Sequence, residues 1–226
     1  MKIIILAAGI GSRLGNPFPK PLTPLKGGKS IMERQIDNLS THFSVHDISV
    51  VVGFKKDLIM ERFPDLTYIY NQFFDATNTS KSLLKALKKY QQEDVLWLNG
   101  DVIFDAELFS VLDKVIEVEN SFVSVNTSRV AEEEVKYTLK NGFIDELSKQ
   151  VQDGLGEAVG INYISKNDMP VLLKHLEKCG DNDYFERGIE TAIQEDGLKV
   201  KAVDISDFRC MEIDFEEDLV AANKMF

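Results

Sequence analysis

Short apolar runs rich in β-branched residues alternate with amphipathic segments in the first half of the chain. The apolar runs, which read as strands, cover residues 2–6, 48–54, 67–71 and 95–101. The amphipathic segments, which read as helices, cover residues 31–43, 55–63 and 77–90. Because parallel strands need a crossover and are buried on both faces, the alternation predicts an α/β fold. We expect a mostly parallel sheet covered by helices on both faces.

The second half of the chain has a different pattern. Strand-like segments cover residues 121–127, 135–149, 158–165 and 198–205, and helical segments cover 167–178, 184–195 and 215–226. Asn141-Gly142 interrupts the second of these strands, and this pair is a strong signal for a β-hairpin turn. No repeat or low-complexity linker divides the sequence. We therefore expect a single domain over residues 1–226, with a β-hairpin inserted in its second half.

The composition excludes several classes of function. The chain has 226 residues and a formal net charge of −11, which argues against general binding to nucleic acid or to an anionic membrane. No apolar run is long enough to span a bilayer, and no signal peptide precedes the first strand. These features predict a cytoplasmic protein.

Charge is distributed unevenly along the chain. Residues 1–32 contain five basic residues and no acidic residue, whereas residues 204–218 contain seven acidic residues and one arginine. Two solvated faces of opposite sign would explain this pattern. The alternative is that the first segment binds an anion and the second binds a cation.

The stretch LAAGIGSRLGNPFPKPL, residues 6–22, follows the first predicted strand directly. A loop at the carboxyl end of a parallel strand is a common ligand site in α/β proteins. Gly9 and Gly11 allow the backbone to approach a ligand closely. Together with the charges of Arg13 and Lys20, this loop is suited to a polyphosphate.

The sequence resembles nucleotidyltransferases of the sugar-phosphate and phosphocholine type in five segments. These are LAAGIGSRLG…PKPL at residues 6–22, TNTSKSL at 77–83, NGD at 99–101, EID at 212–214 and VKYTLKNGFIDELSK at 135–149, which resembles the acceptor-side hairpin of these enzymes. The overall pattern is similar to the short cytidylyltransferases, including those of the CTP:phosphocholine and CTP:phosphoglutamine type. One departure is Gly15-Asn16, which replaces the proline usual after the signature arginine and leucine.

The resemblance implies a reaction and a set of site residues. A Mg²⁺-dependent enzyme would transfer CMP from CTP to a small phosphomonoester and release pyrophosphate. Residues 1–120 would bind the nucleotide and residues 121–226 the acceptor. The catalytic residues would be Lys20, Arg13 and Asp101, and the metal ligands Asp101 and Asp214. The nucleotide-binding residues would be Leu6, Ala7, Ala8, Gly9, Gly11, Asn78, Ser80 and Gly100.

The acceptor site is predicted from charged residues around the hairpin. Lys136 and Lys149 would bind the acceptor phosphate, Glu157 an amine, and Arg129 or Arg187 a carboxylate. No tryptophan occurs between residues 124 and 190 to build an aromatic cage for phosphocholine. This favours a zwitterionic acceptor, with phosphoglutamine as the specific hypothesis.

Other interpretations remain open. A sugar-1-phosphate uridylyl- or thymidylyltransferase would share the motifs, and a non-catalytic nucleotide-binding regulatory domain would share the fold. A dinucleotide-binding fingerprint fails, because Leu14 stands where its last glycine should be. Asn78 and Asp214 could each serve as a helix N-cap instead of contacting a ligand. The protein is expected to act as a monomer or homodimer.

Overall fold

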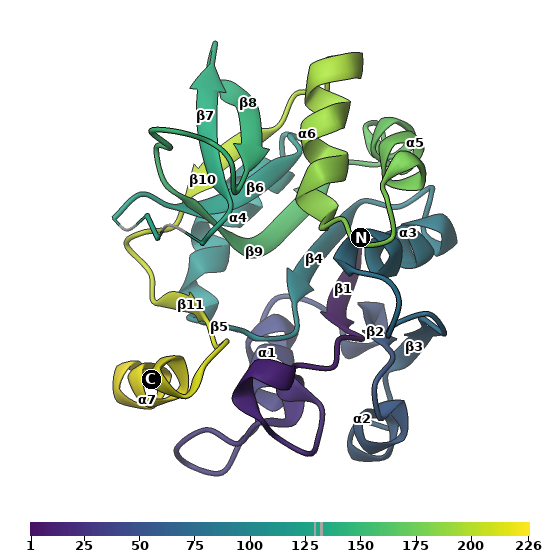
Figure 1. Ribbon diagram of the computed structural model, residues 1–226, viewed down its shortest axis with the longest axis vertical. Helices are drawn as coiled ribbons and strands as arrows, with labels where there is room; N and C mark the ends of the chain where they lie inside the picture. The colour runs from purple at the N-terminus through teal and green to yellow at the C-terminus, as the bar shows by residue number, and fades with distance from the viewer. Residues whose placement is uncertain (129, 132) are drawn as a thin grey trace.

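The computed structural model describes residues 1–128, 130–131 and 133–226 (Figure 1). The strands are β1 Lys2–Ala7, β2 Ile48–Val52, β3 Thr67–Tyr70, β4 Val95–Asn99, β5 Val102–Phe104, β6 Phe122–Asn126, β7 Lys136–Lys140, β8 Phe143–Ser148, β9 Glu157–Ile164, β10 Lys201–Asp204 and β11 Cys210–Glu212. The α-helices are α1 Ile31–Ser40, α2 Lys56–Arg62, α3 Thr79–Lys89, α4 Phe109–Ile116, α5 Met169–Lys178, α6 Phe185–Asp196 and α7 Glu216–Met225.

The central sheet has the strand order β10-β6-β9-β4-β1-β2-β3. Neighbours pair in parallel except β9, which runs antiparallel to both β4 and β6. This confirms the predicted mostly parallel α/β sheet and adds an antiparallel strand that the periodicity did not reveal. Because β9 lies between β4 and β6, the two halves of the chain share one sheet.

The first strand shows why the sheet is covered on both sides. Ile3 and Ile5 pack into one buried cluster with residues of α1 and α4, and Ile4 and Leu6 pack into another with residues of α3, α5 and α6. Successive side chains of a strand point to opposite faces, so a continuous apolar run requires two covering layers. Figure 1 shows α3, α5 and α6 together on one side of the sheet.

Local sequence signals form as predicted. Ser30 caps α1 and forms a capping box with Glu33. Asn141 and Gly142, with φ of 54° and 79°, form the turn between β7 and β8. In the described part of the chain, no helix is both long and apolar enough to cross a membrane.

A second, two-stranded sheet was not expected from the sequence. The short strands β5 and β11 pair antiparallel, with Val102 opposite Glu212. The helix α4 between β5 and β6 was also missed. The β5–β11 pair brings the segment after β4 next to the segment before α7, although more than 100 residues separate them along the chain.

Candidate active site

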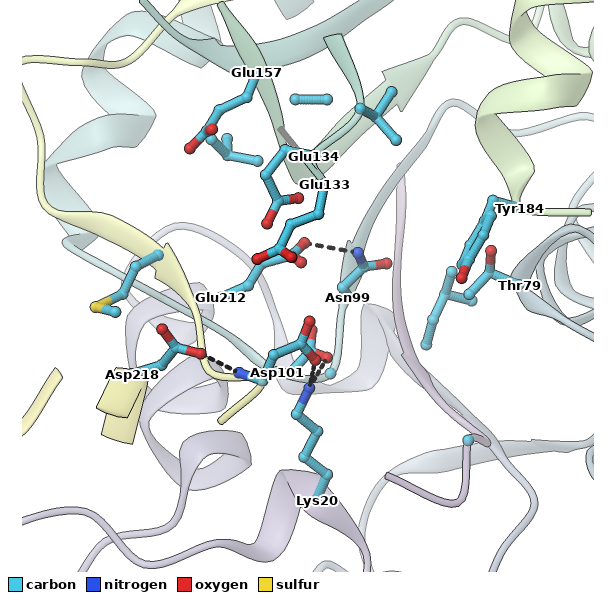
Figure 2. Close-up of a pocket in the computed structure, with 18 of the residues that line it drawn as sticks. Lys20, Thr79, Asn99, Asp101, Glu133, Glu134, Glu157, Tyr184, Glu212 and Asp218 are labelled. Atoms are coloured by element: carbon cyan, nitrogen blue, oxygen red, sulfur yellow. Dashed lines mark hydrogen bonds and ion pairs between the residues drawn. The ribbon is translucent and has the colours of Figure 1, made fainter. Parts of the chain in front are cut away.

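A cleft of about 540 Å³ opens at the carboxyl ends of β1 and β4 (Figure 2). Leu6 and Ala7 at the end of β1, Gly9 and Gly11 in the following loop, and Gly100 after β4 line it. Ligand sites in α/β proteins commonly occupy this edge of the sheet. The glycine loop singled out in the sequence therefore forms part of a real cavity.

Lys20 connects the two ends of the chain inside this cleft. Its Nζ donates to Asp101 Oδ2 at 2.6 Å (Figure 2) and also to Asp214 Oδ1. Arg13 Nη1 donates to the other oxygen of Asp214 at 2.8 Å. Burial lowers the pKa of Lys20, but the two carboxylates outweigh this effect and hold the pKa above its usual value. Burial raises the pKa of Asp214, yet bonds from Lys20 and Arg13 leave it lowered.

The segment that carries Asp101 is held by a buried side chain from α1. Gln35 Nε2 donates to the carbonyl of Asn99 at 2.8 Å and to that of Val102 at 2.7 Å. These two carbonyls flank Asp101 in the chain. Gln35 therefore fixes the turn between β4 and β5 that presents Asp101 to the cleft.

Gly100 allows this turn to pack directly against the end of β1. Its backbone N–H donates to the carbonyl of Leu6 at 2.9 Å, and a Cβ at Gly100 would lie 2.8 Å from the same oxygen. The Ile213 N–H donates to the Asp101 carbonyl at 3.1 Å. Backbone contacts thus place Asp101 and the residue before Asp214 side by side.

Gly11 is required by the position of Lys20. Its φ of 63° lies in the left-handed region, which favours glycine. A Cβ on Gly11 would lie 2.7 Å from Lys20 Cβ. The loop glycine therefore makes room for the lysine that binds both aspartates.

The cleft also contains Glu212, to which the sequence analysis assigned no role. Its Oε1 accepts a hydrogen bond from Asn99 Nδ2 at 3.0 Å (Figure 2). Burial and the charge of Asp101 raise the pKa of Glu212 well above its usual value. Gly160 of β9, with φ of 69°, packs on this pair, and a Cβ there would lie 2.6 Å from Glu212 Oε1. A glycine inside a strand-like sequence was the available signal for this close approach.

The carboxylates of Asp101 and Asp214 fit a small divalent cation. They converge on one nitrogen of Lys20, so two acidic oxygens already share one positive centre. The remaining oxygen of Asp101, Oδ1, is buried without a hydrogen-bond partner in the described residues. Those residues assemble no group of three or more histidine, cysteine or carboxylate ligands. Substrate phosphates and water would therefore complete the coordination, as is common for Mg²⁺.

The second half of the chain lines the opposite side of the cleft with acidic groups. Glu133 and Glu134 point toward Glu212 (Figure 2), and Glu157, whose Oε2 accepts from the Ala131 N–H at 2.9 Å, also lines the cleft. Glu186, in the first turn of α6, also lines the cleft, and burial raises its pKa to about 7. Among the described residues that line this side, Lys149 is basic, and its Nζ lies 5.0 Å from the centroid of the Tyr184 ring.

Most of the predicted site residues on the nucleotide side line the cleft. They are Leu6, Ala7, Gly9, Gly11, Arg13, Lys20, Gly100, Asp101 and Asp214. Of the predicted acceptor residues, Lys149 and Glu157 line it, and Arg129 lies outside the described residues. The structure thus gathers into one cavity residues from both ends and the middle of the sequence.

Five predicted residues do not line the cleft: Ala8, Asn78, Ser80, Lys136 and Arg187. Asn78 caps α3, because its Oδ1 accepts from the Thr79 N–H at 2.8 Å. Ser80 is fully buried, whereas Thr79, one position earlier on the helix, faces the cleft (Figure 2). Arg187 Nη1 instead pairs with Glu190 Oε2 at 2.8 Å.

Comparison with known proteins identifies the family. Residues 3–175 match the MobA-like NTP transferase domain. The chain belongs to this family. The matched segment contains the glycine loop, Lys20 and Asp101, whereas Asp214 lies beyond it. The family assignment therefore covers most of the nucleotide side of the cleft.

Two curated proteins show lower, partial sequence similarity to the chain. The chain is 33% identical to the bifunctional protein GlmU of Methanococcus maripaludis over 172 residues, which cover 73% of this chain and 38% of that protein. It is 24% identical to the CMP-5'-(3-aminopropyl)phosphonate synthase of Streptomyces rubellomurinus, over 100% of this chain and 39% of that protein. The chain thus spans about two fifths of the length of these curated relatives.

A solved structure supports the fold over the whole chain. The inositol-1-phosphate CTP transferase from T. maritima superposes with a TM-score of 0.80 at 17% identity, covering 99% of this chain and 96% of that one. At this identity the similarity shows the α/β fold.

Proposed function

We propose that the chain is a cytidylyltransferase that transfers CMP from CTP to a small phosphomonoester and releases pyrophosphate. The observation that supports this most directly is the convergence of Lys20, Asp101 and Asp214 beside the glycine loop. CTP is favoured among the nucleotides because two of the relatives above are named for CMP or CTP chemistry. Phosphocholine and phosphoglutamine remain the acceptors suggested by the sequence resemblance.

In this reaction an oxygen of the acceptor phosphate attacks the α-phosphorus of CTP. A new P–O bond forms as the bond to the pyrophosphate oxygen breaks, and the electron pair leaves with pyrophosphate. The nucleophile is already ionised, so no general base is required. Catalysis then depends on bringing two anions together and stabilising the charge of the transition state.

The residues of the cleft supply these two requirements. Lys20 would stabilise the α-phosphate, and Arg13 would bind the leaving pyrophosphate. Both are ion-paired with Asp214 in the structure, so binding of the nucleotide would redistribute these contacts. Asp101 and Asp214 would hold Mg²⁺, which when bound would neutralise negative charge on the reacting phosphates.

The test is pyrophosphate release from CTP, UTP, dTTP or ATP with a pool of phosphomonoesters in the presence of Mg²⁺. We expect release with CTP and a loss of about 10²–10³ in kcat for Lys20→Ala, the usual cost of one such donor. Lys29→Ala is the matched control, because Lys29 is an exposed lysine of the same basic segment.

Each other outcome identifies an alternative. Preference for UTP or dTTP with sugar 1-phosphates would indicate a sugar-phosphate nucleotidyltransferase. Nucleotide binding without release from any pair would indicate a non-catalytic domain. Normal turnover by Lys20→Ala would remove this lysine from the mechanism.

A further inference from the structure

The two side chains that would bind the nucleotide phosphates are already paired with carboxylates. Lys20 Nζ donates to Asp101 Oδ2 at 2.6 Å (Figure 2) and also to Asp214 Oδ1. Arg13 Nη1 donates to Asp214 Oδ2 at 2.8 Å, so Asp214 uses one oxygen for each donor. The two cations and the two carboxylates carry no net charge together. By itself this group therefore adds no positive potential that would attract an anion.

Burial strengthens the pairing of Lys20. Its side chain is 10% exposed, so an ammonium group that lost both carboxylates would keep its desolvation cost without compensation. Lysine has three N–H donors, but a phosphate that used only the third would lie beside two carboxylates, and like charges repel. A phosphate that approaches Lys20 therefore competes with these carboxylates. The side chain of Arg13 is 55% exposed, so its ion pair with Asp214 is weaker.

The start of α7 holds Asp214 between the two donors. Asp218 Oδ2 accepts from the Asp214 N–H at 3.0 Å and from the Phe215 N–H at 2.8 Å. The guanidinium of Arg13 also lies over the Phe215 ring, 5.7 Å from its centroid. These contacts fix the backbone of Asp214 and keep Arg13 next to it. Release of the donors then depends on a new partner for the Asp214 carboxylate.

We propose that Asp214 is an internal competitor of the nucleotide phosphates, an autoinhibitory contact that keeps Lys20 and Arg13 occupied until Asp214 binds a cation. This rests on the proposed function, because that function assigns phosphate binding to the two donors. The apparent affinity for a metal-free phosphate chain would fall with the fraction of molecules in which the donors are released. Coordination of Mg²⁺ by Asp101 and Asp214 would free both donors. The exchange therefore favours a nucleotide that enters together with its cation.

Removal of the Asp214 charge separates this role from that of a metal ligand. If Asp214 only holds a metal ion, Asp214→Asn leaves the affinity for metal-free phosphates unchanged. If Asp214 competes with the phosphates, the same substitution strengthens their binding, because Lys20 and Arg13 lose a charged partner. The backbone bonds to Asp218 do not involve the Asp214 side chain, so they are retained in this variant.

Calorimetry in the presence of EDTA measures the affinity of the parent, Asp214→Asn and Asp37→Asn for CTP and for inorganic pyrophosphate. Asp37→Asn is the matched control, because it makes the same charge change at an exposed pair with Lys29 outside the cleft. We expect Asp214→Asn to bind both anions about 5- to 150-fold more tightly than the parent, the range typical of coupled binding equilibria. Asp37→Asn should bind them as the parent does. In a Lys20→Ala background, Asp214→Asn should give a smaller gain, because Arg13 alone remains to be released.

The expected result is a gain in affinity, which a misfolded variant does not produce. Equal or weaker binding by Asp214→Asn, with a cooperative urea transition retained, would overturn the autoinhibitory contact. An equal gain in Asp37→Asn, or an undiminished gain in the Lys20→Ala background, would also overturn it, because either would reflect net charge alone. If Asp214→Asn does not unfold cooperatively, Asp214→Ser is measured by the same criteria.

These outcomes are distinct from failure of the proposed function. Binding of pyrophosphate tests the competition without a base or an acceptor. Tighter binding of pyrophosphate by Asp214→Asn, with no turnover of CTP by the parent, would support the contact and refute the cytidylyltransferase. Turnover of CTP by the parent without the gain in Asp214→Asn would refute the contact and leave the proposed function intact.

Discussion

Replacing Glu186 by glutamine is expected to stabilise the folded protein near neutral pH. Burial is the main reason that the pKa of this carboxyl rises from 4.5 to about 7. The folded state therefore favours the protonated form, and ionisation of Glu186 opposes folding. Glutamine has nearly the same shape and carries no charge at any pH.

The size of the effect follows from the two pKa values. The difference between 4.5 and about 7 corresponds to about 3 kcal/mol in the free energy of unfolding, which is an upper limit for the gain. The glutamine N–H groups in the cleft would lack protein partners, which costs about 1 kcal/mol or more. A net gain of about 1–2 kcal/mol is expected above pH 7.

The pH dependence has a definite sign. Below about pH 4.5 the carboxyl is protonated in both the folded and unfolded states, so it contributes no penalty. As the pH rises from 4.5 to 7, the unfolded state loses its proton first, and the parent loses stability relative to the variant. Above pH 7 both states are ionised, and the difference stays constant.

Urea unfolding at several pH values between about 5 and 8 measures this difference. Glu61→Gln makes the same charge change at an exposed position and should show no such trend. An advantage of Glu186→Gln that is the same at pH 5 and pH 8 would refute the reasoning, because it would not arise from ionisation. A destabilised variant at pH 8 would refute it more directly.

Four further substitutions test the geometry of the nucleotide side. Asp101→Asn and Asp214→Asn should each lower kcat by at least about 10², with a cooperative melt retained; near-parental turnover in steady-state assays would exclude that residue from the metal site. Gly11→Ala should lower the free energy of unfolding by about 1–3 kcal/mol and also reduce kcat, because φ is 63° and the new Cβ would meet Lys20 Cβ at 2.7 Å. Urea unfolding and turnover measure the two effects, and loss of stability with full turnover would show that Lys20 tolerates the shift. Gln35→Leu should leave the carbonyls of Asn99 and Val102 without this donor, which costs about 1–3 kcal/mol in the free energy of unfolding. It should also lower kcat with little change in KM for CTP, and a change in KM alone would argue against a role of Gln35 in positioning Asp101.

The sequence predicted best those features that depend on neighbouring residues. The capping box of Ser30 and Glu33 and the Asn141-Gly142 turn each form within a few positions of the chain. The apolar runs are similarly local, because strand burial requires continuous hydrophobic residues. The strand segments of the first half could therefore be predicted without long-range information, whereas the place of β9 between β4 and β6 could not.

Features that depend on distant pairing could not be predicted in the same way. The strands β5 and β11 have three residues each, too few for a periodic signal, and they pair across more than 100 positions. The place of Glu212 beside Asn99 follows from that pairing. The choice between Thr79 and Ser80 depends on how α3 is rotated against the sheet, which its composition does not specify.

The two ends of the cleft differ in how their negative charge is balanced. At the nucleotide end, Lys20 binds both Asp101 and Asp214, yet Asp101 Oδ1 still lacks a partner in the described residues. At the α6 end, Lys149 only partly offsets the burial of Glu186, whose Oε2 also lacks one. Both oxygens reduce the stability of the protein without ligand. In the proposed function, Mg²⁺ accompanies the nucleotide to the first site, where it would help to hold the acceptor phosphate facing the α-phosphate.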